Sequence, residues 1–395
     1  MQNMKGTMNF DFNLKTNAKF GPGKALQLAQ YLKELSLFKP GIIIDGGIAW
    51  LDYSKKILST LESDSELTIK IWVYDLRHEP DYDSLDRIKM MFLDASGKPV
   101  IDCFVGIGGG SVIDFAKGLS TVVVNPGIAV QYKGFPVNIQ PSLPTIAIPT
   151  TAGTGSEVTY NAVFTDNEQK KKLGINTRNN FPALALLDPI LTVNSPLSVT
   201  VSSGMDALVH TLESYSAVQS NPLSRIFARE AFAMIFNNLF LVKDNPGDCE
   251  VRAKIQYGAY LAGISLINSG SGPSGALSYP LGVHFKVPHG MAGAVFIPHI
   301  IRHNVQLGYD YSELYDLIDG VDHSISHESK NEKFAEKMFL LCKKFEVPEK
   351  LSGFGVNAST VDLLLAEIDT LDRAFAQNPV TFTTEDGKRL IRSMI

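Results

Sequence analysis

The strongest constraint on the fold is a change of hydrophobic pattern after Asp188-Pro189. Before that point, short β-rich runs alternate with segments of helical periodicity, whereas from about Ser202 onward the apolar spacing is helical almost throughout. The alternation predicts an α/β unit in which helices cover both faces of a parallel sheet, and the remainder predicts an all-α unit. Because 395 residues exceed what one hydrophobic core normally supports, we expect two domains, 1–195 and 196–395.

The candidate elements follow from the two periodicities. Strand candidates are Gly41–Asp45, Ile69–Asp75, Val100–Ile107 and Thr145–Pro149, and further strand-like runs at 159–165, 171–176 and 183–187 suggest an added sheet region. Helical periodicity marks Ala25–Leu35 and 84–94 in the first half, and 203–218, 223–240, 250–267, 291–305, 331–345 and 359–370 in the second.

Charge and composition narrow the classes of partner. The net charge of −5 argues against nucleic acid, whose binders usually carry a basic excess. No apolar stretch is long enough to span a bilayer, and Met1–Phe10 lacks the apolar run of a signal peptide. Cys103, Cys249 and Cys342 lie far apart, which fits a reducing compartment and no metal-type spacing. We therefore expect a cytoplasmic protein without nucleic-acid or membrane partners.

A glycine-rich turn follows the third strand candidate. Gly108, Gly109 and Gly110 allow close approach of a ligand, and Ser111 and Asp114 have the spacing of a capping box, which predicts that a helix begins there. Free amides and the helix dipole at such a terminus favour an anion, for example a dinucleotide pyrophosphate. The alternative is a glycine-rich turn that binds nothing.

A second turn of this kind follows the strand Thr145–Pro149. Thr150, Thr151 and Thr154 carry hydroxyls for the ribose or nicotinamide amide of a cofactor, and Thr154 and Glu157 again have capping-box spacing. A loop of ordinary turn residues is the alternative.

Asp45 ends an apolar strand, immediately before Gly46-Gly47. A carboxylate in that place can accept hydrogen bonds from an adenosine ribose and repels a 2′-phosphate, which favours NAD over NADP. The alternative is that Asp45 simply turns the chain.

A set of metal-type side chains lies in the second half. Asp206 and His210 are four residues apart and share one face of a helix, and His289 is expected on a loop between Pro288 and Gly290. One carboxylate and two imidazoles suit Zn²⁺ or Fe²⁺. Taken alone, the pair is better explained by a polar helix face.

Together, these motifs resemble the iron-containing, or group III, alcohol dehydrogenases over essentially the whole chain. The resemblance rests on the turns at 108–114 and 149–157, Leu187-Asp188-Pro189, the run Gly204-Met205-Asp206-x-x-x-His210, Pro288-His289-Gly290 and, near the end, Asn378-Pro379 with Thr381. It implies an N-terminal dinucleotide domain, an all-helical C-terminal domain, and NAD(P) and a divalent metal in the cleft between them. A homodimer is expected.

The resemblance also implies roles for single residues. Asp206, His210 and His289 match metal ligands, and Lys172 matches a lysine near the ribose. The full set of cofactor-binding candidates, from the motifs and the resemblance, is Asp45, Gly108, Gly109, Gly110, Ser111, Asp114, Thr150, Thr151, Thr154 and Lys172.

The chain departs from this family at two positions. Members usually carry His-x-x-x-His immediately before Pro-Leu-Gly, where this chain has Gly275 and Tyr279. One metal ligand is therefore missing, and the residue implicated in proton transfer is a phenol. Three interpretations follow: the metal keeps three protein ligands and water, His284 in the loop before His289 replaces the missing ligand, or the metal is lost.

The resulting prediction is a metal-assisted, NAD(P)-dependent alcohol dehydrogenase that interconverts an alcohol and its aldehyde or ketone. The metal acts as a Lewis acid and Tyr279 stands in the proton path. Gly275 should widen the pocket, and Tyr279, His284 and Lys286 suit a polar or sugar-acid alcohol. The alternatives are a metal-independent reductase, a lyase resembling dehydroquinate synthases, and a degenerate nucleotide-binding protein.

Overall fold

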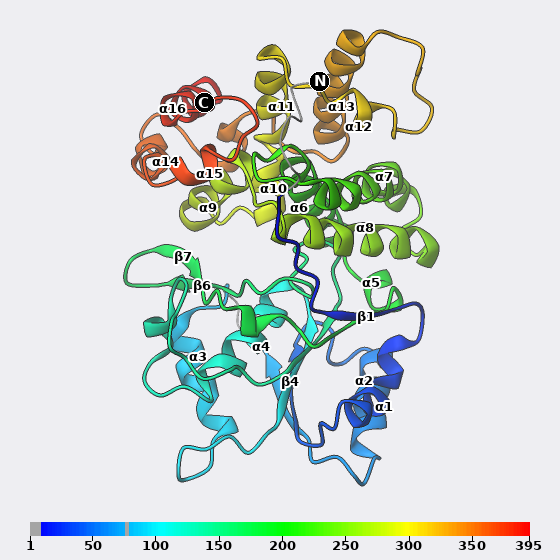
Figure 1. The fold of residues 1–395 in the computed structure, drawn as a ribbon, viewed down its shortest axis with the longest axis vertical. Helices are drawn as coiled ribbons and strands as arrows, with labels where there is room; N and C mark the ends of the chain where they lie inside the picture. The colour runs from blue at the N-terminus through cyan, green and yellow to red at the C-terminus, as the bar shows by residue number, and fades with distance from the viewer. Residues whose placement is uncertain (1–8, 76–78) are drawn as a thin grey trace.

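The computed structural model describes residues 9–75 and 79–395 and shows a parallel sheet beneath a stack of helices (Figure 1). The sheet has six strands in the order β1-β8-β5-β4-β2-β3, and a separate hairpin joins β6 and β7. The strands are β1 (Asn17–Phe20), β2 (Pro40–Asp45), β3 (Lys70–Tyr74), β4 (Cys103–Gly108), β5 (Thr145–Pro149), β6 (Val163–Asp166), β7 (Lys171–Gly174) and β8 (Leu184–Leu187). The predicted fold class, an α/β half followed by a helical half, is confirmed.

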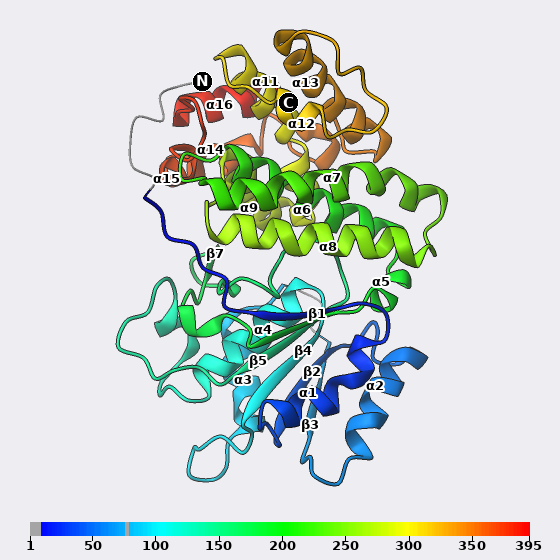
Figure 2. The same cartoon turned by 45° about the vertical axis from the view of Figure 1, so that its right-hand side comes forward.

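Helices cover both faces of the sheet (Figure 2). They are α1 (Leu28–Glu34) and α2 (Asp52–Glu62) on one face and α3 (Tyr82–Lys89) and α4 (Gly110–Val122) on the other. Alternation along β2 shows how one strand serves two cores: Ile42 and Ile44 pack with α1 and α2, whereas Ile43 packs with α3 and α4. All three side chains are fully buried, as expected for a central parallel strand.

The second half contains helices only. They are α5 (Ile190–Val193), α6 (Leu197–Ser216), α7 (Pro222–Asp244), α8 (Cys249–Ile267), α9 (Pro273–Phe285), α10 (His289–Ala294), α11 (Ile297–Gln306), α12 (Ser312–Tyr315), α13 (His327–Lys344), α14 (Val361–Ile368), α15 (Asp372–Phe375) and α16 (Thr384–Ser393). Short 3₁₀ turns occupy Lys24–Gln27, Met90–Phe92, Ala129–Tyr132, Arg178–Asn180 and Leu351–Phe354. Within the described ranges, no helix is both long enough and apolar enough to cross a membrane.

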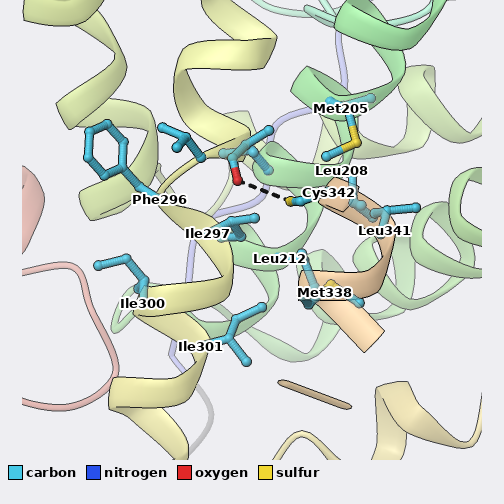
Figure 3. Close-up of a cluster of buried hydrophobic side chains, with 14 of the residues drawn as sticks. Met205, Leu208, Leu212, Phe296, Ile297, Ile300, Ile301, Met338, Leu341 and Cys342 are labelled. Carbon is cyan, nitrogen blue, oxygen red and sulfur yellow. Dashed lines mark hydrogen bonds between the residues drawn. The ribbon is translucent and has the colours of Figure 1, made fainter. Parts of the chain in front are cut away.

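The helical core forms where α6, α11 and α13 meet (Figure 3). Met205, Leu208 and Leu212 project from α6, and Ile297, Ile300, Ile301, Met338 and Leu341 close the cluster around them. Cys342 lies in this core, and its thiol donates to the carbonyl oxygen of Ala294 at 3.4 Å. Burial raises the pKa of this thiol to about 12, so Cys342 packs as an inert apolar group.

Two strand predictions need correction. The strand predicted at Val100–Ile107 begins only at Cys103, because the backbone N–H of Val100 donates to the carbonyl of Phe92 and the Asp102 carboxylate accepts the N–H groups of Phe38 and Lys39 before β2. The runs 159–165 and 171–176 form the expected added sheet region, the antiparallel hairpin β6–β7, whereas 183–187 joins the main sheet as β8. Because the sheet ends at Leu187 and α6 begins at Leu197, a boundary near 195 fits the element order, but the two domains stay a prediction.

Most of the stretch before His289 is helical and not a loop. Pro273 occupies the first position of α9, where its missing N–H costs nothing, and this helix carries His284. His289 is the first residue of α10 and follows the N-cap Pro288. The loop assignments for His284 and His289 are therefore wrong.

Candidate active site

The predicted cofactor residues of the first half converge at one edge of the sheet. Parallel pairing sets Ile44 of β2 beside Ile107 of β4, and Gly108 beside Pro149 of β5. From β2 the chain proceeds outward to β3, then returns past β2 to β4 and continues to β5. This reversal of direction is a topological switch point at the carboxyl ends of β2 and β4, and open α/β sheets bind ligands in the crevice outside such a point.

The first glycine turn fits tightly against the second. Gly109 is the N-cap of α4 and the helix begins at Gly110. A Cβ on Gly110 would lie 2.5 Å from Cγ2 of Thr154, so only glycine lets the two turns touch. Ser111 is exposed in the first turn of α4, which leaves its hydroxyl accessible at the crevice.

Asp114 does not form the predicted capping box. Among the described residues no side chain caps α4, and the Asp114 carboxylate instead accepts the hydroxyl of Ser156 and the N–H of Val163, the latter at 2.9 Å. The ammonium of Lys117 donates to Ser156 at 2.8 Å and to the carbonyl of Asn161 at 3.0 Å. Asp114 and Lys117 thus link α4 to the second turn and to the residues that follow it.

The second turn, 149–157, lies against the first. Thr150 is buried and Oγ1 of Thr151 lies 3.4 Å from the Cβ position of Gly109. The predicted capping box of Thr154 and Glu157 is absent, because Thr154 Oγ1 accepts the N–H of Ser156 at 3.2 Å and no helix follows in this described stretch.

Asp45 and Lys172 are two further cofactor candidates with contacts of their own. Asp45 Oδ1 accepts the N–H of Gly47 at 2.8 Å, which leaves the second carboxylate oxygen for a ligand. Lys172, on β7, forms an ion pair with Glu79, and its ammonium lies 3.6 Å from the Cβ position of Gly282 on α9. The hairpin therefore reaches the helical half. The cofactor roles of these residues stay predictions.

The three predicted metal ligands lie together. Oδ1 of Asp206 is 3.6 Å from Nε2 of His210 and 3.8 Å from Nε2 of His289, and the three ligand atoms lie within 4.8 Å of one another. Ligand bonds of about 2.0–2.2 Å require ligand atoms at most roughly 4.2 Å apart, so both Asp206 distances fit one ion. Gly290 permits this arrangement, because a Cβ there would lie 1.8 Å from the carbonyl oxygen of Ser202 on α6.

The protonation of this cluster suits metal binding. Burial lowers the pKa of His289, with Asp206 opposing the shift, so the imidazole is neutral and its ring nitrogen is free to coordinate. Asp206 and His210 are buried, and Nδ1 of His210 has no hydrogen-bond partner within the described chain. One carboxylate and two imidazoles are a donor set for Zn²⁺ or Fe²⁺.

α9 places two further side chains beside the cluster. The Tyr279 ring centroid is 5.1 Å from that of His289, and burial, reinforced by Asp206, raises the pKa of the phenol to about 12. Tyr279 is therefore a proton donor at neutral pH. Ser278 Oγ lies 2.8 Å from Nδ1 of His289, a contact that sequence reasoning did not anticipate.

His284 and Gly275, the two positions linked to the missing ligand, make contacts away from the three metal-ligand candidates. His284 Nε2 is 2.5 Å from Oε1 of Glu367 on α14, and His284 is outside the Asp206 cluster. The space next to Gly275 is filled: a Cβ would lie 2.4 Å from Ser271 Oγ and 2.9 Å from Glu213 Oε2. The expected widening of the pocket at Gly275 is therefore wrong.

The chain is similar to known proteins in sequence and in fold. The model of the iron-containing alcohol dehydrogenases matches residues 15–189, and that of the C-terminal part of the Fe-containing alcohol dehydrogenase family matches residues 200–395. Alcohol dehydrogenase 4 of Saccharomyces cerevisiae is 30% identical over 373 residues, which cover 94% of this chain and 95% of that protein. An NAD-dependent methanol dehydrogenase of Bacillus methanolicus is 28% identical, with 98% and 100% covered.

Solved structures give the same result. A 1,3-propanediol oxidoreductase superposes with a TM-score of 0.90 at 27% identity, covering 98% of this chain and all of that one. An alcohol dehydrogenase from Oenococcus oeni superposes with a TM-score of 0.87 at 26% identity and the same coverage.

Proposed function

We propose that this chain, which belongs to the iron-containing alcohol dehydrogenase family, interconverts an alcohol and its aldehyde or ketone with NAD and a divalent metal. The metal would be held by Asp206, His210 and His289. The observation that carries the proposal is the meeting of these three side chains, from two helices, with both imidazoles within 3.8 Å of the Asp206 carboxylate. When bound, the metal supplies Lewis acidity for the substrate hydroxyl, and the nicotinamide supplies the redox chemistry.

The protein's own groups bind and orient the reactants. Amides at the start of α4 and the hydroxyls of the second turn would hold the dinucleotide, with its pyrophosphate at Gly109 and Gly110. Asp45 would accept hydrogen bonds from the ribose. The phenol of Tyr279, protonated because of its high pKa, would donate a hydrogen bond at the reacting oxygen.

A small polar alcohol is the proposed substrate class. The ammonium of Lys172 lies 3.6 Å from the Cβ position of Gly282 on α9 and offers a hydrogen-bond donor to a second oxygen of the substrate. His284 is hydrogen-bonded to Glu367, so it is not proposed to contact the substrate.

We also propose a cytoplasmic homodimer. β1 is an edge strand with four exposed residues, and Phe20 keeps 41% of its surface exposed. An exposed edge strand presents unpaired backbone groups that can pair with a second copy. Sedimentation velocity with Phe20→Lys tests the assignment: the substitution should shift the dimer toward monomer, and an unchanged dimer would place the interface elsewhere.

The decisive experiment pairs elemental analysis with an activity screen. After anaerobic reconstitution, the protein should hold one divalent metal per chain and reduce NAD with small alcohols. Activity that survives complete chelation would indicate the metal-independent reductase. A product formed without net NAD reduction would indicate the lyase, and a protein inactive with every alcohol would indicate the degenerate nucleotide-binding protein.

A further inference from the structure

Ser278 belongs to a continuous chain of hydrogen bonds that ends at a proposed metal ligand. Its hydroxyl lies 2.6 Å from the carbonyl oxygen of Gly275 and 2.8 Å from Nδ1 of His289. The side chain is buried, so these two neighbours decide where its single proton goes.

The directions of these bonds follow from what each atom can donate. A carbonyl oxygen carries no proton, so the Ser278 hydroxyl must donate to Gly275. The same hydroxyl then has only lone pairs for His289, and the Nδ1–H of the imidazole must be the donor. A neutral imidazole with its proton on Nδ1 leaves a lone pair on Nε2, the atom 3.8 Å from Oδ1 of Asp206.

The turn of α9 that carries the chain is fixed by Glu213 from α6. Its buried carboxylate accepts the N–H of Gly272 at 2.7 Å, of Ser274 at 2.6 Å and of Gly275 at 3.2 Å. Pro273 has no N–H, so one carboxylate satisfies every free amide in the first turn of the helix. Because α6 also carries Asp206 and His210, Glu213 sets α9 in a fixed place relative to two of the three ligands.

We infer that Ser278 is a positioning residue: it holds His289 as the Nδ1–H tautomer with Nε2 turned to the metal, on a helical turn that Glu213 locks to α6. The inference rests on the proposed metal site. Because position 275 is a glycine, the site has three protein ligands, and Ser278 holds one of them, His289, in place. Such outer contacts orient ligands and typically change metal affinity ten- to hundredfold.

Ser278→Ala tests the inference, with Ser274→Ala as the matched control. Ser274 lies one turn earlier in the same helix, is equally buried, and its Oγ has no partner within the described residues. Two readouts are compared in all three proteins: the His289 tautomer in the metal-free state, from long-range ¹H–¹⁵N correlation spectra, and affinity for Zn²⁺ alone. The parent and Ser274→Ala should show Nδ1–H, and Ser278→Ala should shift toward Nε2–H with roughly ten- to hundredfold weaker Zn²⁺ binding.

The outcomes separate this inference from the proposed function. Nε2–H in the parent protein overturns the assignment of Ser278 whatever the variant does, including a variant that does not fold. Zn²⁺ binding by the parent with unchanged affinity in Ser278→Ala overturns it too and leaves the metal site standing. A tautomer shift in a protein that binds no Zn²⁺ supports the role of Ser278 and removes the proposed metal site.

Discussion

The sheet edge and the helical cluster build their parts of the site in different ways. At the sheet edge, Asp45, Gly108 and Pro149 each end a strand, and parallel pairing alone brings those ends together. In the helical half, His289 meets Asp206 only because α10 packs directly on α6. Local sequence patterns predict the first arrangement, whereas the second depends on tertiary packing. Substitutions in the two regions should therefore have separate effects on cofactor binding and on metal binding.

The largest expected effect is on metal binding. His289→Ala removes one of three protein ligands, so affinity for Zn²⁺ should fall by more than roughly a hundredfold, beyond the usual range for an outer contact. NADH affinity should change little, because the sheet edge is built independently. Calorimetric titration of each ligand measures both. Equal Zn²⁺ affinity in parent and variant would show that the cluster holds no metal.

Proton donation should come next in size. Tyr279→Phe keeps the ring that packs beside His289 and removes the hydroxyl, so kcat should fall by about a hundredfold. The phenol is protonated below its pKa of about 12 and loses its proton only as the pH rises through that value. The variant should therefore be slower without losing any limb of the pH profile between about pH 6 and pH 10. A limb that disappears would mean that Tyr279 titrates in the working range.

The third prediction concerns the close contact between the two turns at the sheet edge. Gly110→Ala places a Cβ 2.5 Å from Thr154, and overpacking of about 2 kcal/mol would weaken NADH binding roughly thirtyfold. Gly247→Ala is the control, because this glycine lies outside the two turns and nothing lies within 4 Å of its Cβ position. Fluorescence titration with NADH compares the two. Equal losses in both would show that the contact between the turns does not shape the cofactor site.

The smallest effect concerns the choice of cofactor. Asp45→Asn keeps an oxygen for the N–H of Gly47 and removes the charge that opposes a 2′-phosphate. Discrimination against NADP should relax by about tenfold, or roughly 1.4 kcal/mol. The ratio of kcat/KM with NAD to that with NADP measures it. An unchanged ratio would remove Asp45 from the ribose site.

The sequence predicts the features that depend on local patterns and misses those that depend on tertiary packing. Strand–turn–helix patterns located β4, Gly110 and β5, and the i, i+4 spacing placed Asp206 and His210 on one face. The capping role of Asp114 failed because Ser156 and Val163, distant in sequence, bind the carboxylate instead. Ser278 was missed for the same reason: its partner lies on the next helix, and no local periodicity links them.

The sequence holds further signals for Glu213 and for the start of α9. Glu213 lies three residues after His210 and seven after Asp206, so it shares their face of α6. Gly272-Pro273 has the pattern of a helix start, which would have predicted α9 and removed His284 from a loop. What local patterns cannot give is the packing that aims the Glu213 carboxylate at that helix start.

The central claim is a metal held by one carboxylate and two imidazoles, and X-ray absorption at the zinc K-edge of the Zn²⁺-loaded protein tests it most directly. The account predicts nitrogen and oxygen neighbours at about 2.0–2.2 Å, with multiple scattering from two imidazoles, and no imidazole contribution from His289 in His289→Ala. A third imidazole in the parent that disappears in His284→Ala would contradict the account, because His284 would then have left Glu367 to replace the missing ligand.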